Sequence, residues 1–169
     1  MRRKILIICG ITALILIAAV VWFLLFGQKY RIYQAQDFEI KYPNWPDVEK
    51  RNILEPEKTK LAVVNKGCNF VINVTAIPAS TTFKEYTEKL VQEQIAKTKG
   101  KIITQDIQDK VAYFEGEIPI GNTTLHSVSY GYMTSLRQSY GIGFIAPKST
   151  FETVCRPIIS EVVKSVKVR

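Results

Sequence analysis

A lone histidine beside a serine is the first place in this sequence where side chains could do chemistry. His126 is the only histidine, Ser127 follows it, and the carboxylates Glu115 and Glu117 come shortly before. A serine hydrolase needs a nucleophile, a base and an orienting acid that converge in space, and no glycine-flanked nucleophile motif accompanies these residues. A zinc site needs three or four ligands, and no cluster of cysteine and histidine supplies them. We therefore predict no catalytic residue, no metal ligand and no enzymatic activity.

The spacing of these residues has a structural explanation. His126 alternates with Val128 and Tyr130, which is typical of a strand with one buried face, so we predict a half-buried strand residue. Glu115 and Glu117 project from one face of their strand, where paired acids could act as acid and base or bind a metal. Solvent-facing charge on an antiparallel strand also explains them, and we prefer that interpretation.

The densest aromatic group in the chain follows His126. Tyr130, Tyr132, Tyr140 and Phe144 fall on two neighbouring segments, with Arg137 at the turn between them. If exposed, such a group could hold an apolar ligand or a partner protein. Packing in the core is the other interpretation, and the one that we prefer.

Two cysteines are predicted to face the interior. Cys68 alternates with apolar residues of a strand, and Cys155 lies among the apolar positions of the last helix. An oxidising compartment would permit a disulfide between them if their Cα atoms came within about 4.4–6.8 Å. Two separate buried thiols are the alternative. The third cysteine, Cys9, lies in the apolar N-terminal segment and should pair with neither.

The elements that must position these residues follow a long apolar segment. Residues 5–26 contain no charged side chain and come after Arg2, Arg3 and Lys4. At about 1.5 Å per residue, a helix of this length reaches about 33 Å and can cross a hydrocarbon core of about 30 Å. A cleaved signal peptide has a shorter apolar region of about 7–15 residues and a small-residue cleavage site. We therefore predict an uncleaved transmembrane anchor.

The anchor divides the chain and sets its expected location. Basic residues at the N-terminus favour a cytoplasmic N-terminus. We therefore predict an anchor over residues 1–27, a linker over 28–36 and a domain over 37–169 outside the cytoplasm, in a single-pass membrane protein of bacterial origin.

Charge and glycine patterns bear on partners and cofactors. Without the three N-terminal basic residues, 20 Lys and Arg stand against 15 Asp and Glu. This mild excess fits ordinary solubility, and it could also favour an anionic membrane surface. No basic run or RNA-type aromatic motif indicates nucleic acid. Gly141 and Gly143 precede a strand rather than the helix N-terminus that a dinucleotide site needs, so we expect no cofactor.

Hydrophobic periodicity predicts an α+β domain. Thr82 and Glu85 have capping-box spacing at the start of a helix over 82–99, and Gly100 is expected to end it. Ser149 and Glu152 have the same spacing before a final helix, in which Pro157 either causes a kink or starts a new turn. Tight turns between the strands make them antiparallel neighbours. The predicted strands cover 37–42, 60–64, 68–77, 101–107, 111–120, 123–134 and 139–146.

Several of these segments together resemble one family. FEIKYP at residues 38–43 followed by Trp45, TFKEY at residues 82–86 and the closing helix around Phe151 resemble PsbP-like proteins, a superfamily that includes the photosystem II PsbP subunits and Mog-type Ran-binding proteins. The resemblance covers roughly residues 36–168 and implies an α-β-α sandwich around an antiparallel sheet. It also implies a binding or assembly module, and the anchor is similar to that of membrane-attached bacterial members. No manganese, calcium or Ran-binding motif matches residue by residue, so no site is transferred.

Three functions are compatible with these observations. The first is a membrane-anchored extracytoplasmic module that binds a protein partner. The second is a domain that binds a lipid or small apolar ligand, which a cavity lined by the Tyr130–Phe144 aromatics would favour. The third is a hydrolytic or metal-dependent enzyme, which would require a cleft that brings His126 within hydrogen-bond reach of Glu115 or Glu117.

Overall fold

The computed structural model describes residues 29–49 and 55–169 of the 169-residue chain. Its main element is an antiparallel sheet with the strand order β3-β4-β8-β7-β6-β5. Sequential strands pair side by side except where β8 returns to β4. The strands are β3 (Thr59–Asn65), β4 (Cys68–Ala76), β5 (Lys101–Ile107), β6 (Val111–Ile120), β7 (Thr123–Met133) and β8 (Gln138–Pro147).

A second, three-stranded sheet has the order β1-β2-β9 and consists of β1 (Tyr30–Gln34), β2 (Phe38–Pro43) and β9 (Lys167–Val168). The predicted linker over 28–36 is therefore wrong over most of its length. The residues of this segment do not show a strand pattern in the sequence. The reason is that β1 pairs with β2 at the rim of the domain, and only Tyr30, Tyr33 and Ala35 of the segment pack against the core.

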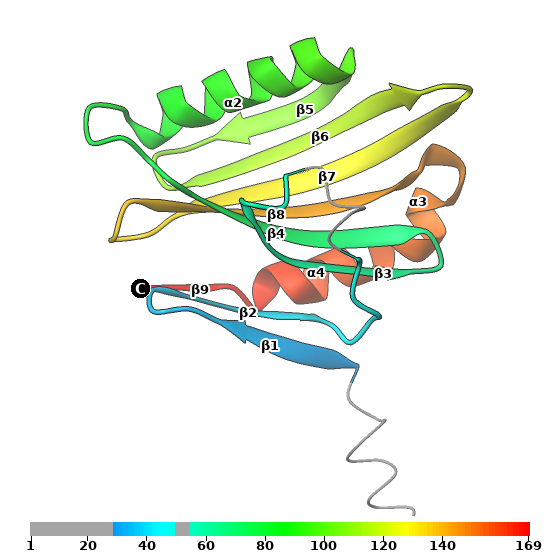
Figure 1. The fold of residues 1–169 in the computed structure, drawn as a ribbon, viewed down its shortest axis with the longest axis horizontal. Helices are drawn as coiled ribbons and strands as arrows, with labels where there is room; N and C mark the ends of the chain where they lie inside the picture. Colours follow the sequence, from blue (N-terminus) through cyan, green and yellow to red (C-terminus); the bar gives the residue numbers. More distant parts are fainter. Residues whose placement is uncertain (1–28, 50–54) are drawn as a thin grey trace, which may run out of the picture.

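The two faces of the large sheet are covered differently (Figure 1). Helix α2 (Phe83–Thr98) contacts β5 and β6 at one end, and its buried Phe83 lies over Gly131 of β7. Helices α3 (Lys148–Val154) and α4 (Arg156–Lys164), together with the small sheet, pack on the other face. The predicted α+β class and antiparallel central sheet are confirmed. One outer layer of the expected sandwich, however, also contains a sheet.

The main core lies between the large sheet and the small sheet with α3 and α4. Phe38 of β2 stacks on Tyr140 of β8 with ring centroids 4.2 Å apart, and Tyr42 is parallel to Phe70 at 6.3 Å. The alternating residues of β2 therefore close the core, and Trp45 packs at its margin. Each fully buried side chain of this kind stabilises the fold by about 1.5–3 kcal/mol.

The helix ends follow the sequence only in part. The capping box of Thr82 and Glu85 is present, but Lys99, with φ of 54°, rather than Gly100 adopts the left-handed conformation at the end of α2. The second predicted box is wrong, because α3 begins at Lys148 after Pro147 and has no side-chain cap. Of the two alternatives for Pro157, the restart is found, since this residue lies in the first turn of α4.

The cap of α2 provides a local test of this fold. The Thr82 Oγ1 atom accepts from the Glu85 backbone N–H at 3.2 Å. Thr82→Ala leaves this donor without its partner, and we expect a loss of about 1 kcal/mol in the free energy of unfolding. Thr82→Ser keeps the hydroxyl and should retain most of that stability. Chemical denaturation of the two variants checks the difference, and equal midpoints would contradict the capping role.

The predicted anchor over residues 1–27 lies outside the described residues. Within 29–49 and 55–169, no helix combines the length and apolar character needed to cross a membrane.

Candidate functional site

The aromatic group singled out in the sequence is mostly core. Tyr132 is 8%, Tyr140 2% and Phe144 0% exposed, so these three cannot form the proposed ligand or partner surface. Tyr130 is half-buried against them, and Arg137 is exposed at the turn, where its Nη2 donates to the Pro78 and Thr81 carbonyls. The group fills the space under the small sheet, because β7 and β8 turn the same face toward it.

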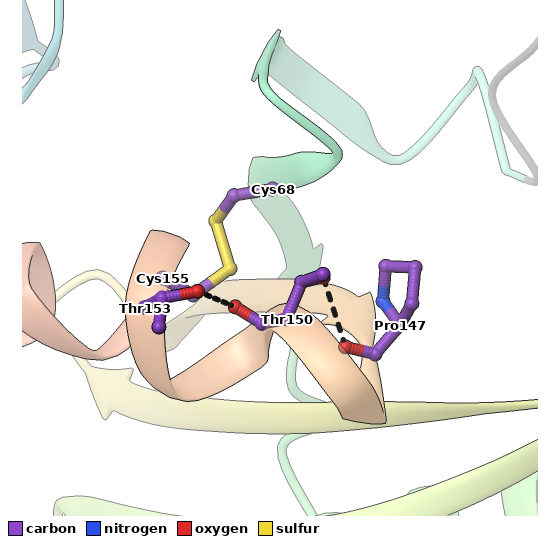
Figure 2. The surroundings of a disulfide bond; sticks show 5 residues. All are labelled: Cys68, Pro147, Thr150, Thr153 and Cys155. Atoms are coloured by element: carbon purple, nitrogen blue, oxygen red, sulfur yellow. Dashed lines mark hydrogen bonds between the residues drawn. A yellow bond between two sulfur atoms is a disulfide. The ribbon is translucent and has the colours of Figure 1, made fainter.

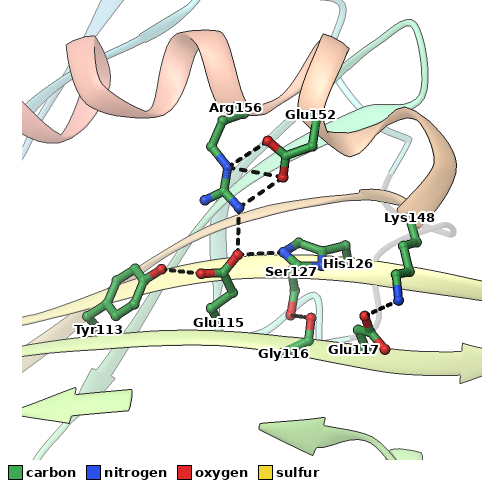
Figure 3. A network of polar contacts seen from close by, with 9 residues as sticks. All are labelled: Tyr113, Glu115, Gly116, Glu117, His126, Ser127, Lys148, Glu152 and Arg156. Atoms are coloured by element: carbon green, nitrogen blue, oxygen red, sulfur yellow. Dashed lines mark hydrogen bonds and ion pairs between the residues drawn. The ribbon is translucent and has the colours of Figure 1, made fainter. Parts of the chain in front are cut away.

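A polar network lies on the same face of the large sheet, beside α3 and α4 (Figure 3). Strand β6 places Tyr113, Glu115 and Glu117 on this face, and β7 places His126 directly opposite Glu117. Glu115 accepts from the Tyr113 hydroxyl at 2.6 Å, and its Oε1 lies 2.7 Å from His126 Nε2. His126 is 8% exposed, and its ring packs on Phe151 with centroids 4.5 Å apart.

The two C-terminal helices complete this network. Arg156 Nη2 donates to Glu115 Oε1 at 2.6 Å, and the same guanidinium holds Glu152 one helical turn earlier. Glu117 lies between Lys101 and Lys148, whose Nζ atoms are 3.0 and 2.6 Å from its oxygens. The network therefore joins β6 and β7 to α3 and α4 through charged hydrogen bonds.

The carboxylates in the network are held in their charged form. Hydrogen bonds from Tyr113, Arg156 and His126 lower the pKa of Glu115 to about 2 despite its partial burial. Burial and the bond to Glu115 raise the pKa of Tyr113 to about 12. Hydrogen bonds to Lys148 and Lys101 also lower the pKa of Glu117. At neutral pH the carboxyl groups of Glu115 and Glu117 are therefore charged, and the hydroxyl of Tyr113 keeps its proton.

The contacts of these residues bear on the acid–base chemistry considered for them. His126 and Glu115 do come within hydrogen-bond reach, but Glu115 already holds three donors, and a carboxyl group with so low a pKa is a weak base. Ser127 points to the opposite face of β7 and contacts the Gly116 carbonyl at 3.4 Å, so it does not join His126 as a nucleophile. Within the described ranges, no three His, Cys, Asp or Glu residues are grouped as metal ligands.

Two parts of the sequence interpretation change here. Glu115 and Glu117 are not freely solvent-facing, because their side chains are 16% and 9% exposed. Arg156 was not identified from the sequence as a functional residue. Its signal is weak, a single arginine between Cys155 and Pro157 in an otherwise apolar helix pattern, and only the fold shows that it reaches β6.

Cys68 and Cys155 form a disulfide in the structure (Figure 2). Their Cα atoms are 5.5 Å apart, both residues are fully buried, and 87 positions separate them in the chain. Cys68 begins β4 and Cys155 lies at the junction of α3 and α4. The bond therefore links the helical layer to the large sheet. The sequence left open a disulfide or two separate buried thiols, and the structure contains the disulfide.

Two shallow hollows of the described surface lie away from the aromatic group and the polar network. One, of about 280 Å³, is bordered by Tyr30, Trp45 and Ile158, with Lys29 at its rim. The other, of about 400 Å³, is lined by Tyr30, Arg31, Ile32 and Lys41. Both open beside β1, at the end of the molecule opposite α2 (Figure 1).

Comparison with known proteins identifies the fold. The sequence matches no protein-family model and no curated protein sequence. The structure is similar to that of cyanobacterial PsbP (CyanoP) from Synechocystis sp. PCC 6803, with a TM-score of 0.65 and 14% identity over 83% of this chain and 93% of that one.

Two further solved structures share this architecture. One is the Ran-binding protein Mog1p of Saccharomyces cerevisiae, with a TM-score of 0.57 and 11% identity over 82% of this chain and 95% of that one. The other is PA94 of Pseudomonas aeruginosa, a protein of unknown function and putative regulator, with a TM-score of 0.54 and 10% identity over 84% and 99%. The chain therefore has a PsbP-like fold, as its sequence motifs predict. Identities this low establish the fold alone.

Proposed function

We propose that this protein is a non-enzymatic binding and assembly module, anchored in a bacterial membrane by its N-terminal apolar segment, whose folded domain binds a partner protein outside the cytoplasm. The buried Cys68–Cys155 disulfide is the observation that carries the extracytoplasmic location in this proposal. Disulfides persist in oxidising compartments and are rare in the cytosol of mesophiles. A basic N-terminus ahead of an apolar segment long enough to span a bilayer gives the same orientation.

The polar network is explained better by a structural role than by catalysis. An acid–base site needs a group whose pKa lies near the working pH and an open position for the substrate. The pKa values of Glu115 and Tyr113 are moved away from neutrality, and His126 lies beneath Phe151 and beside Glu115. The described hollows lie elsewhere. The network is therefore best explained as the joint that fixes α3 and α4 on the sheet.

We propose that the ligand of this domain is a protein. Mog1p is described as a Ran-binding protein, and its fold is similar to that of this chain. For this chain the analogy gives only the class of ligand, a protein, and not its identity. The second candidate, an apolar-ligand domain, receives no support from the aromatic group, since Tyr132, Tyr140 and Phe144 are buried in the core.

Photo-crosslinking in intact cells tests this function. A photoreactive amino acid is placed at exposed positions of α2 and β5, such as Lys89 and Ile103, and at the buried Ile142 as a matched control. We expect one recurrent protein to be captured from exposed positions and none from Ile142. If no position gives a discrete partner, or the control captures the same protein, the assembly role is wrong.

The compartment is tested separately. Protease added to spheroplasts should degrade the C-terminal domain, because the proposed orientation places this domain outside the cytoplasmic membrane. A cytoplasmic protein measured in the same samples must stay intact. A domain that survives protease until the cells are lysed would refute the proposed orientation, whatever the crosslinking result.

A further inference from the structure

Basic, aromatic and apolar side chains gather at the end of the molecule where the described chain begins. We call this the basal surface. Ile32 is 60% exposed, Tyr30 and Trp45 are half-buried, and the three basic side chains are exposed. Both hollows described above open within it. The basal surface consists of Lys29, Tyr30, Arg31, Ile32, Lys41 and Trp45.

The three basic side chains of this surface are exposed to solvent. Among the residues that the structure describes, Lys29, Arg31 and Lys41 form no ion pair. Two acids, Glu39 and Glu161, interact with residues of this surface or of its strands. Glu39 pairs with Lys167 at 2.6 Å, although Lys41 also helps to lower its pKa, and Glu161 accepts from the Tyr30 hydroxyl at 2.8 Å.

The length of chain ahead of β1 limits where this surface can lie. Only residues 27–29 separate the end of the apolar segment at Phe26 from Tyr30, the first residue of β1. Four Cα–Cα steps span at most about 14 Å when fully extended. The headgroup region on one side of a bilayer is about 5–7 Å thick. A domain tethered this closely must therefore hold the start of β1 at or just above the headgroups.

We propose that the basal surface binds anionic phospholipid headgroups, with its three basic residues on the phosphates and with Ile32 and Trp45 at the interface. This inference rests on the proposed membrane anchor and adds the orientation of the domain on the bilayer. Lys and Arg beside an anionic surface attract it, and aromatic rings such as tryptophan are enriched at membrane interfaces. A lipid surface is a better partner than a protein for these basic, aromatic and apolar residues, because the short segment before β1 keeps all of them close to the bilayer.

Quenching of Trp45 fluorescence in the full-length chain tests the proposal. The chain has two tryptophans, so Trp22→Phe leaves Trp45 as the only reporter. The protein is reconstituted in vesicles of phosphatidylcholine alone or mixed with phosphatidylglycerol, and the neutral quencher acrylamide is added. The test variant is K29Q/R31Q/K41Q. The matched control is K84Q/K89Q/K97Q, which removes the same charge from exposed positions of α2 at the other end.

We expect Trp45 to be shielded when phosphatidylglycerol is present and exposed to quencher without it. Each basic residue at an anionic surface contributes about fivefold, so the test variant should lower the ratio of docked to undocked domains about 100-fold, and the control should not change it. Equal quenching in both lipids, shielding retained in the test variant, or loss of shielding in the control variant overturns the proposal. Shielding that depends on protein density rather than on lipid charge indicates a second copy and also overturns it.

Two measurements distinguish a loss of lipid contact from a loss of membrane insertion or of folding. Alkaline extraction of the membranes should leave every variant in the pellet, and release would refute the anchor rather than the lipid contact. Thermal unfolding of each variant should match that of the unsubstituted chain, since the three basic residues are exposed. A variant with a normal melting curve and normal membrane insertion therefore reports on the basal surface alone.

Discussion

Replacing Cys68 and Cys155 together with alanine should lower the free energy of unfolding by about 4–5 kcal/mol. The bond closes a loop with a sequence separation of 87 residues, and in the chain-entropy model a loop of this size restricts the unfolded chain by about that amount. The loss is large compared with the total stability of about 5–15 kcal/mol that is usual for a folded protein. Urea unfolding of the full-length chain in detergent measures it.

The third cysteine provides the matched control for this experiment. Cys9→Ala should leave the unfolding midpoint unchanged, because Cys9 lies in the apolar N-terminal segment. A reducing agent should act on the native chain only as it unfolds, since both Cys68 and Cys155 are fully buried. An unchanged midpoint in the double alanine variant would show that the bond does not stabilise the domain.

The secondary structure of the domain could be predicted from the sequence where local signals are strong. The helix predicted over 82–99 is present as Phe83–Thr98 with its capping box, although only Phe83 and Thr87 of its side chains are buried. β1 was missed because Arg31, Ile32 and Gln34 are exposed and only its partner strand makes it a strand. β9, which is two residues long, depends in the same way on β2. Strands that are defined by a distant partner carry little signal of their own.

The candidate site was less predictable because its contacts join distant segments. Glu115 and His126 were both identified, but the hydrogen bond between them depends on the register of β6 with β7. Arg156 reaches Glu115 across 41 residues of sequence, and no local pattern reports such a contact. The same holds for Lys29 and Lys41, which share the basal surface only because β1 pairs with β2.

Replacing Glu115 with glutamine should have the second largest effect, a loss of about 2–3 kcal/mol in the free energy of unfolding at neutral pH. The change removes a charged acceptor from Tyr113, His126 and Arg156 at once. A hydrogen bond to a charged group contributes about 1.5–3 kcal/mol, and a partner left unsatisfied adds its own cost. Because Arg156 is partly exposed, the expected loss in the free energy of unfolding is smaller than the loss on breaking a fully buried ion pair.

The pH dependence distinguishes this carboxylate from the others. Because the folded pKa of Glu115 is about 2, below its ordinary value of 4.5, its contribution is present above about pH 4.5 and disappears as the pH falls toward 2. The stability difference between the native chain and Glu115→Gln should therefore shrink over this window. Glu117→Gln is the matched control on the same strand face, and its lysine partners are 59% and 68% exposed, so water can replace the lost acceptor. If both substitutions cost the same at pH 7, or the Glu115 difference persists at pH 2, the network does not hold α3 and α4 on the sheet through this carboxylate.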